Sequence, residues 1–304
     1  MIILGLLAAP AAGAGVRWEQ LTLEQALAKA EREDKLVMVD VWAEHCHSCG
    51  DMDEQLWDSA EGEELAEGLV CIKLASDKPE AIPLHRGYPI LGLPAVIFLE
   101  PDGTEIDRIV GFTGGVDRFL AEARMLKSGA DPLPAMEEQL AAHPTSQRLM
   151  SAVLEKYLYR QRLPEAERLL ARLVELDADR TSAEARKGIV FVAKYHDYFT
   201  RNTAKAQEHW RFLLEEYIDT PSVGSGVSAT FKHAQTYGKF DEWIDYICGL
   251  MAEHPESGRL CYYAAINAIR AGLKHQCLAD AARKAHSLGI GPKDLDQKAT
   301  QLEP

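Results

Sequence analysis

Apolar and polar positions change their period along the chain, and the change separates an α/β half from a helical half. The runs at 36–43 and 69–75 are short, rich in Val, Leu and Ile, and typical of buried parallel strands. The runs at 94–100 and 104–112 flank Pro101-Asp102-Gly103, a turn signal that predicts a hairpin.

Three segments around these runs have helical spacing. The first covers residues 22–35, where Thr22 as N-cap and Gln25 three residues later predict a capping box. The others cover residues 47–67 and 116–127. The predicted order is therefore αβαβ, a connecting segment, and then ββα, which indicates a mixed sheet with flanking helices.

The rest of the chain is predicted to be helical and repetitive. HPTSQRL at 143–149 recurs as HPESGRL at 254–260. Three further segments each place small or apolar residues at helical spacing before an acidic turn: 163–179, 203–221 and 240–255. Their anchors Ala166, Ala206 and Trp243 are 40 and 37 residues apart, a spacing that predicts an all-α helical repeat solenoid, with 274–289 as a capping copy.

The ends of these regions define the domain prediction. The first sixteen residues carry no charged side chain, and Ala12-Gly13-Ala14 matches a small-residue cleavage site. A membrane-spanning helix needs about 20 apolar residues, so residues 1–16 are predicted to be a signal peptide instead. Because a basic region before the apolar stretch is missing, we expect the true start to lie further upstream. The α/β domain then covers 17–127, a Gly- and Pro-containing linker 128–135, and the helical domain 136–304.

Charge and compartment narrow the choice of partners. The net charge is −14, and residues 15–130 hold 11 Lys and Arg against 23 Asp and Glu. An acidic first half argues against nucleic acid as a partner, because phosphate binding needs a basic surface. A signal peptide predicts a periplasmic or secreted protein, in an oxidising compartment where disulfides persist.

The stretch VDVWAEHCHSC contains the candidate chemistry, and three interpretations of Cys46 and Cys49 compete. Haem attachment requires histidine after the second cysteine, where this chain has Gly50. A metal site could use His45, Cys46, His47 and Cys49, but three consecutive residues do not easily point at one ion, and we find no partner CxxC or HxxxH. No metal site is therefore predicted.

The redox interpretation has a physical basis. A CxxC that follows a strand and opens a helix puts its first sulfur at the helix N-terminus, where unpaired amides favour thiolate. Cys46 would then be the attacking thiolate and Cys49 the more buried resolving thiol. No cofactor is needed beyond a redox-active Cys46–Cys49 disulfide.

With its neighbours, this stretch resembles the active-site strand and turn of the thioredoxin superfamily. The resemblance covers roughly residues 18–127 and is most similar to the C-terminal thioredoxin-like domain of the membrane thiol-disulfide interchange reductases, as the Leu-Gly-Leu-Pro segment at 91–94 and Trp57 indicate. It implies an α/β thioredoxin fold and thiol-disulfide exchange with protein substrates and an upstream dithiol donor or acceptor.

The resemblance also implies roles for single residues. Asp40 corresponds to the family's buried carboxylate and Lys73 to its lysine partner, a pair that moves protons to and from Cys49. Pro94 corresponds to the cis-proline, which exposes the backbone of Leu93 to an extended substrate. Three more residues are candidates for substrate contact, although Trp42 suits packing better: Trp42, His45 and His47.

Departures from the family pattern leave the direction of electron flow open. His45 replaces the tryptophan of the closest relatives, and the dipeptide between the cysteines is His-Ser rather than Gly-Pro. A protonated His47 would stabilise the Cys46 thiolate, whereas Asp51 and Asp53 would oppose it. Reduction, oxidation and isomerisation therefore all remain open.

The helical half resembles the tetratricopeptide repeat family. LPEAERLLARLVELDAD at 163–179 matches its second helix, with Ala166, Leu170 and Leu173 at the packing positions, whereas the signature of the first helix is weak. The resemblance implies a surface that binds a protein or peptide partner. The alternative function is a repeat-based scaffold or assembly factor with a redox-inactive thioredoxin-like domain.

The remaining cysteines give two further expectations. Cys71, in the middle of a strand, is predicted to be a buried free thiol. Cys248 and Cys261 lie about equally far from the turn at 254–255 and would face one another in an antiparallel helix pair. A disulfide between them is one possibility, and buried thiols, with Cys277 as a third, are the other.

Overall fold

The computed structural model describes residues 15–304, which divide into two compact units on either side of the boundary between residues 138 and 139. The division follows the predicted linker at 128–135, within which helix α6 (Leu133–Ala142) already begins. The predicted signal peptide lies outside the described residues except for its last two. Among the described helices, no single one combines the length and apolar character needed to cross a membrane.

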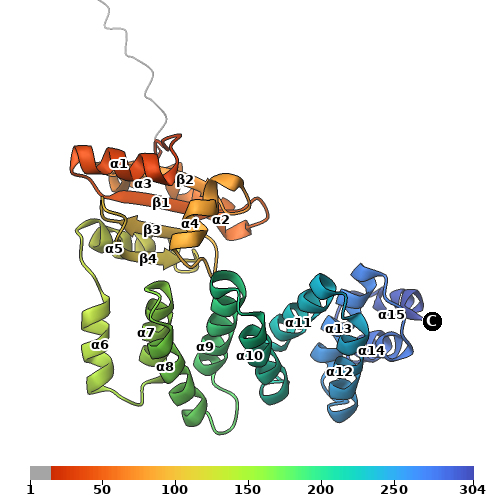
Figure 1. Ribbon diagram of the computed structural model, residues 1–304. Coiled ribbons are helices and arrows are strands. Elements are labelled where there is room, and N and C mark those ends of the chain that lie inside the picture. Colours follow the sequence, from red (N-terminus) through yellow and green to blue (C-terminus); the bar gives the residue numbers. More distant parts are fainter. Residues whose placement is uncertain (1–14) are drawn as a thin grey trace, which may run out of the picture. The chain divides into compact units, whose positions relative to one another are not determined.

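The first unit is a four-stranded mixed sheet with helices on both faces (Figure 1). The strand order is β2-β1-β3-β4; β1 and β2 are parallel, whereas β3 is antiparallel to β1 and β4, so the predicted hairpin is confirmed. The elements are α1 (Leu23–Glu33), β1 (Val37–Trp42), α2 (His47–Met52), the π-helical turn η1 (Asp53–Trp57), α3 (Ala60–Ala66), β2 (Val70–Ala75), the 3₁₀ turn η2 (Pro79–Ala81), α4 (Ile82–Gly87), β3 (Ala95–Leu99), β4 (Glu105–Val110) and α5 (Gly115–Lys127).

Side-chain alternation gives the sheet two apolar faces, because successive residues of a strand point to opposite sides. The odd-numbered residues of β1, such as Val39, form one core with α1 and α4. Met38, on the other face, forms a second core with α2, η1, α3 and α5. Asp40 shares the face of Met38, and the parallel register pairs it with Lys73. The sheet therefore directs two charged residues toward the side that carries the cysteine-bearing helix.

The predicted helix at 47–67 is interrupted, which corrects the expectation of one continuous element. A wider turn, η1, follows α2, and α3 then starts anew. Ser59 has extended backbone dihedrals and its hydroxyl accepts a hydrogen bond from the Gly62 amide at 3.1 Å, so it acts as the N-cap of a new helix. By contrast, the predicted capping box of Thr22 and Gln25 is confirmed at α1.

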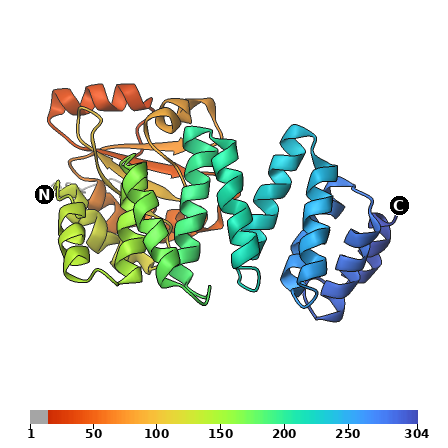
Figure 2. The same cartoon turned by 60° about the horizontal axis from the view of Figure 1, so that its bottom comes forward.

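The second unit is helical, and Figure 2 shows its helices following one another in chain order. The elements are α7 (Gln147–Tyr159), α8 (Leu163–Leu176), α9 (Ala183–Lys194), the π-helical turn η3 (Tyr195–Thr200), α10 (Thr203–Glu216), α11 (Val223–Tyr237), α12 (Phe240–Glu253), α13 (Gly258–Ala271), α14 (Gln276–Ser287), α15 (Leu295–Ala299) and the 3₁₀ turn η4 (Thr300–Leu302). The anchors Ala166, Ala206 and Trp243 are buried in α8, α10 and α12. Membership of a particular repeat family stays a prediction.

The cysteines of the second unit pair differently from the expectation. Cys248 of α12 forms a disulfide with Cys277 of α14, and Cys261 of α13 is a buried free thiol. The expectation considered only the antiparallel pair α12–α13, whereas α14 also packs against α12. Cys261 is buried in the apolar core of the unit, whereas Cys248 and Cys277 are only partly buried and pack against that core.

Candidate active site

Cys46 and Cys49 form a disulfide at the start of α2, directly after the loop that leaves β1. Cys46 occupies the N-cap position, and its carbonyl accepts hydrogen bonds from the amides of Cys49 at 3.0 Å and Gly50 at 3.3 Å. Cys46 is half-buried, whereas Cys49 is 3% exposed. An incoming thiol can therefore reach the sulfur of Cys46 more easily than that of Cys49.

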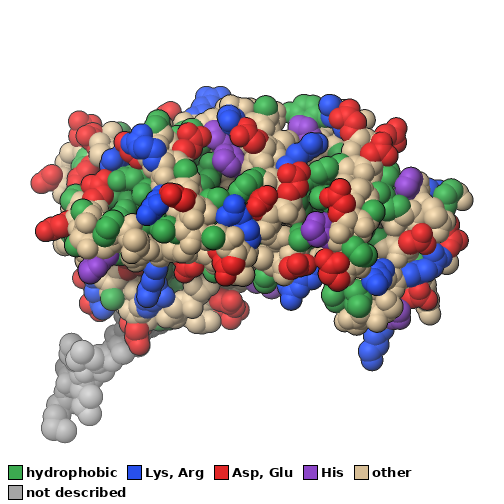
Figure 3. Space-filling model, turned by 90° about the horizontal axis from the view of Figure 1, so that it is seen from below, with side chains coloured by type: hydrophobic (Ala, Val, Ile, Leu, Met, Phe, Trp, Pro, Cys, Tyr) green, Lys and Arg blue, Asp and Glu red, His purple; other side chains and the backbone are tan. Residues whose placement is uncertain are grey.

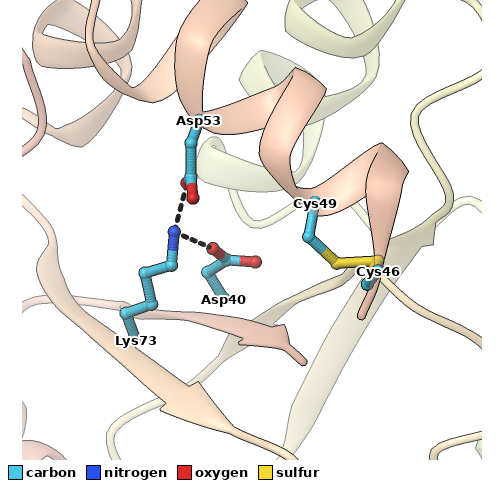
Figure 4. The surroundings of a disulfide bond; sticks show 5 residues. All are labelled: Asp40, Cys46, Cys49, Asp53 and Lys73. Atoms are coloured by element: carbon cyan, nitrogen blue, oxygen red, sulfur yellow. Dashed lines mark hydrogen bonds and ion pairs between the residues drawn. A yellow bond between two sulfur atoms is a disulfide. The ribbon is translucent and has the colours of Figure 1, made fainter. Parts of the chain in front are cut away.

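Asp40 and Lys73 lie beneath this helix as an ion pair. The Lys73 Nζ is 3.3 Å from one Asp40 carboxylate oxygen, and Asp40 is 2% exposed. The second oxygen, Oδ1, is buried and has no hydrogen-bond partner among the described residues. In Figure 4 the carboxylate lies between Lys73 and the disulfide, with this second oxygen on the Cys49 side. A weak interaction with the Trp57 indole also acts on this carboxylate, and its second oxygen faces the side that carries the disulfide.

Asp53 is a third member of this charge cluster, and sequence reasoning missed its contact. The Lys73 ammonium also forms an ion pair with Asp53 of η1, so one lysine is shared by two carboxylates (Figure 4). The same ammonium lies 5.6 Å from the ring centroids of Trp18 and Trp42. The spacing of Asp53, four residues after Cys49, was the available signal, because residues four apart share a helix face.

The environment of Asp40 changes its protonation. Burial raises its pKa to about 6, against the smaller lowering effect of the Lys73 charge. A carboxyl group with this pKa exchanges protons readily near neutral pH, as general acid–base catalysis requires. The nearby thiol of Cys71 is free and buried, as predicted, and burial raises its pKa to about 12, so it stays protonated.

Pro94 lies at the same end of the sheet as the cysteines. The Leu93–Pro94 peptide bond is cis. In the antiparallel register Val41 pairs with Ala95, so Pro94, directly before β3, is level with Trp42 at the end of β1, four residues before Cys46. Pro94 is buried and Leu93 is half-buried. The topology therefore brings the predicted substrate-contacting segment to the end of the sheet at which β1 leads into the disulfide.

The remaining predicted contact residues differ in exposure. His45 and His47 flank Cys46 and are exposed, so their rings can meet a bound molecule. Trp42 is half-buried and its ring contacts the Lys73 ammonium, in keeping with the packing role expected for it.

Comparisons with known proteins agree with this geometry for the first unit. Residues 17–101 match a family model described as thioredoxin-like. The chain is 29% identical over 94 residues to the thiol:disulfide interchange protein DsbD of Klebsiella pneumoniae and 30% identical over 94 residues to that of Vibrio cholerae. Each match covers 30% of this chain and only 15% or 16% of the relative, so the similarity spans about a sixth of those proteins.

Two solved protein structures are similar to part of the chain. One is the DsbH oxidoreductase, with 22% identity, a TM-score of 0.34, and coverage of 40% of this chain and 89% of that one. The other is the oxidised C-terminal domain of Neisseria meningitidis DsbD, with 27% identity, a TM-score of 0.29, and coverage of 34% and 91%. The family match and the sheet topology together establish a thioredoxin-like domain with a disulfide-forming Cys46–Cys49 pair in the first unit.

Proposed function

We propose that the protein is a thiol-disulfide oxidoreductase that exchanges the Cys46–Cys49 disulfide with cysteines of other proteins. The observation that carries the proposal is the disulfide itself, formed at a helix start with its first sulfur accessible and a buried carboxylate behind it. The similarity to the thiol:disulfide interchange proteins supports the same reaction type.

In the reducing direction the reaction has two exchange steps. The Cys46 thiolate attacks one sulfur of a substrate disulfide, which forms a mixed disulfide and releases the other substrate sulfur as a thiolate. Cys49 then loses its proton and attacks the Cys46 sulfur, which releases the second substrate thiolate and leaves the Cys46–Cys49 disulfide. Two electrons pass from the pair to the substrate, and the reverse sequence oxidises a dithiol.

Asp40 would serve the second step by accepting the Cys49 proton. Its burial, the position of its second oxygen on the Cys49 side and its pKa of about 6 support this role. Lys73, shared with Asp53, would keep the carboxylate anchored while it gains or loses the proton.

The substrate would bind at the end of the sheet next to the disulfide, where Leu93 and Pro94 precede β3. The backbone at Leu93 and Pro94 would pair with an extended segment of the substrate, and the exposed rings of His45 and His47 would contact the residues around its cysteine. A protein substrate with an exposed, locally extended cysteine segment fits this arrangement.

The second unit would bind a protein partner and bring it to the redox pair. Support comes from a pocket of about 360 Å³ between α10, α11 and α12, whose lining includes Arg211, His233 and the exposed Tyr237. On the face drawn in Figure 3 basic and acidic side chains are interspersed, which suits a protein better than a polyanion. The periplasmic or secreted location expected from the apolar N-terminus would suit a disulfide-exchanging protein.

The decisive experiment is trapping of the mixed disulfide. In Cys49→Ala the resolving thiol is missing, so a covalent complex with a model disulfide protein should accumulate and be released by dithiothreitol, as non-reducing electrophoresis would show. In Cys46→Ala no such complex should form. If neither the native chain nor Cys49→Ala forms one, the first unit has no exchange activity and the scaffold interpretation takes its place.

To determine the direction of electron flow, the reduction potential of the Cys46–Cys49 pair would be measured by equilibration with glutathione buffers. A value near −270 mV would indicate a reductase, and one near −120 mV a disulfide donor.

A further inference from the structure

Three side chains of the second unit converge from three different elements. Glu167 comes from α8, His196 from the π-helical turn η3 and His209 from α10. One ligand atom of each lies within 4.8 Å of the others. The two imidazole rings are stacked, with an angle of 9° between their planes and 5.7 Å between their centroids. Residues distant in sequence have thus been gathered at one point by the fold.

His196 is the strongest sign that the point is a site. Its side chain is 4% exposed, and its Nε2 is buried with no hydrogen-bond partner among the described residues. A buried polar atom without a partner is costly and calls for an explanation such as an ion. The Nε2 lies 3.4 Å from a Glu167 carboxylate oxygen. Two ligands about 2.0–2.1 Å from a tetrahedral Zn²⁺ are separated by nearly the same distance, about 3.4 Å.

Neighbouring hydrogen bonds are compatible with the His196 tautomer that a metal needs. The Thr200 hydroxyl donates to the His196 carbonyl oxygen at 3.4 Å, so its oxygen is available as an acceptor for the His196 Nδ1, 3.3 Å away. With the proton on Nδ1, Nε2 presents its lone pair toward Glu167. Metal-binding histidines are regularly oriented in this way by a second hydrogen bond.

The local backbone and charges suit a cation. His196 lies on a π-helical turn, a rare element that is frequent at functional sites. Lys205, whose charge acts on His209, forms an ion pair with Glu208 at 2.8 Å. Glu167 is 44% exposed, so an ion can enter from solvent and keep water on its remaining position.

We propose that Glu167, His196 and His209 bind a divalent transition-metal ion of the Zn²⁺ type. Two imidazoles and one carboxylate are a ligand set that suits Zn²⁺ and its neighbours in the transition series and does not suit Ca²⁺ or Mg²⁺. The ion links α8, η3 and α10, and it adds to the proposed redox function without depending on it. The sequence predicted no metal site, because the three ligands are not close together in the chain.

Cobalt binding to the full chain tests the site, since Co²⁺ replaces Zn²⁺ and is coloured. With both disulfides intact, we expect one equivalent of Co²⁺ to bind with visible d–d bands and no thiolate charge-transfer band, and added Zn²⁺ to remove the colour. His209→Gln and the exposed-site variant Glu167→Gln should each weaken binding at least tenfold, and Thr200→Val by about tenfold. The matched control is His286→Gln, an exposed histidine of α14, which should bind as the native chain does.

Circular dichroism of each variant separates loss of the site from loss of the fold, and Glu167→Gln changes only an exposed side chain. Three results would overturn the proposal: no saturable binding by the native chain, unchanged affinity in both His209→Gln and Glu167→Gln, or a charge-transfer band that assigns the ion to cysteine sulfur.

Discussion

Asp40 shows how far a single residue can be interpreted from sequence. Its position two residues before Trp42, together with Lys73 in the next strand, was enough to predict a buried pair from the family pattern, and the register places the two side by side. The contact of Lys73 with Asp53 was harder to predict, because the spacing of Asp53 from Cys49 is only a weak signal and the π-helical turn η1 replaces the regular helix expected there. Likewise, His196 and His209 become neighbours only when η3 packs against α10 in the folded chain.

Replacing Asp40 by Asn should change the pH dependence of stability. The pKa of Asp40 is about 6 in the folded chain and near 3.8 when unfolded. Between these pH values Asp40 is protonated in the folded state but ionised in the unfolded state. The contribution of Asp40 to the free energy of unfolding therefore falls as the pH rises from about 4 to about 6. We therefore expect Asp40→Asn to gain about 2.4 kcal/mol relative to the native chain between pH 4 and pH 7.

Urea denaturation of the oxidised proteins at several pH values measures this difference. The control is Asp51→Asn, at an exposed position of α2, which should follow the native chain throughout. A constant difference between Asp40→Asn and the native chain over this pH range would show that Asp40 has an ordinary pKa.

At the level of elements, strand runs and turn signals predicted the sheet and its hairpin, but helix boundaries around the site were less predictable. The segment after Cys49 has uniform helical spacing, yet the chain forms α2, η1 and α3 in succession. The break depends on close packing of α3 against the backbone of η1. A Cβ on Gly62 would lie 2.2 Å from the Leu56 carbonyl oxygen, so only glycine fits there. Hydrophobic periodicity does not contain this information.

Gly62→Ala should therefore destabilise the first unit by about 1–3 kcal/mol, because the backbone must shift to admit the methyl group. Gly50→Ala, in α2, is the matched control: nothing lies within 4 Å of its Cβ position, and alanine favours helix there by up to about 1 kcal/mol. Calorimetry of the full chain measures both. Equal melting temperatures for the two variants would contradict a close contact between α3 and η1.

At the scale of the whole molecule, the sequence predicted an α/β region followed by helices, and the structure has both. Whether the helices belong to the tetratricopeptide family depends on a signature that is weak in this chain, so that assignment stays a prediction. The pairing of Cys248 was not deducible from spacing, because three cysteines of the helical region allow three different pairs. Only the packing of α14 against α12 selects Cys277.

Removing this disulfide should destabilise the second unit. It joins residues separated by 29 positions. Closing a loop of that length lowers the conformational entropy of the unfolded chain and so stabilises the folded state by about 3–4 kcal/mol. We expect Cys248→Ser/Cys277→Ser to lower the melting temperature of the second unit and leave that of the first unchanged, as calorimetry would show. Cys46→Ser/Cys49→Ser, whose loop spans three positions, should have about half that effect on stability, about 1.6 kcal/mol. A fall of similar size in both double variants would contradict this account.

The Cys248–Cys277 bond also has a consequence for how the protein is made. During synthesis Cys261 emerges before Cys277 and is only thirteen residues from Cys248, so the shorter and incorrect loop can close first. Its closure entropy is more favourable by about 0.7 kcal/mol than that of the native loop. We therefore expect oxidative refolding of the reduced chain to pass through a Cys248–Cys261 species, which must reshuffle before Cys261 can be buried as a free thiol, and mass spectrometry of trapped intermediates would detect it.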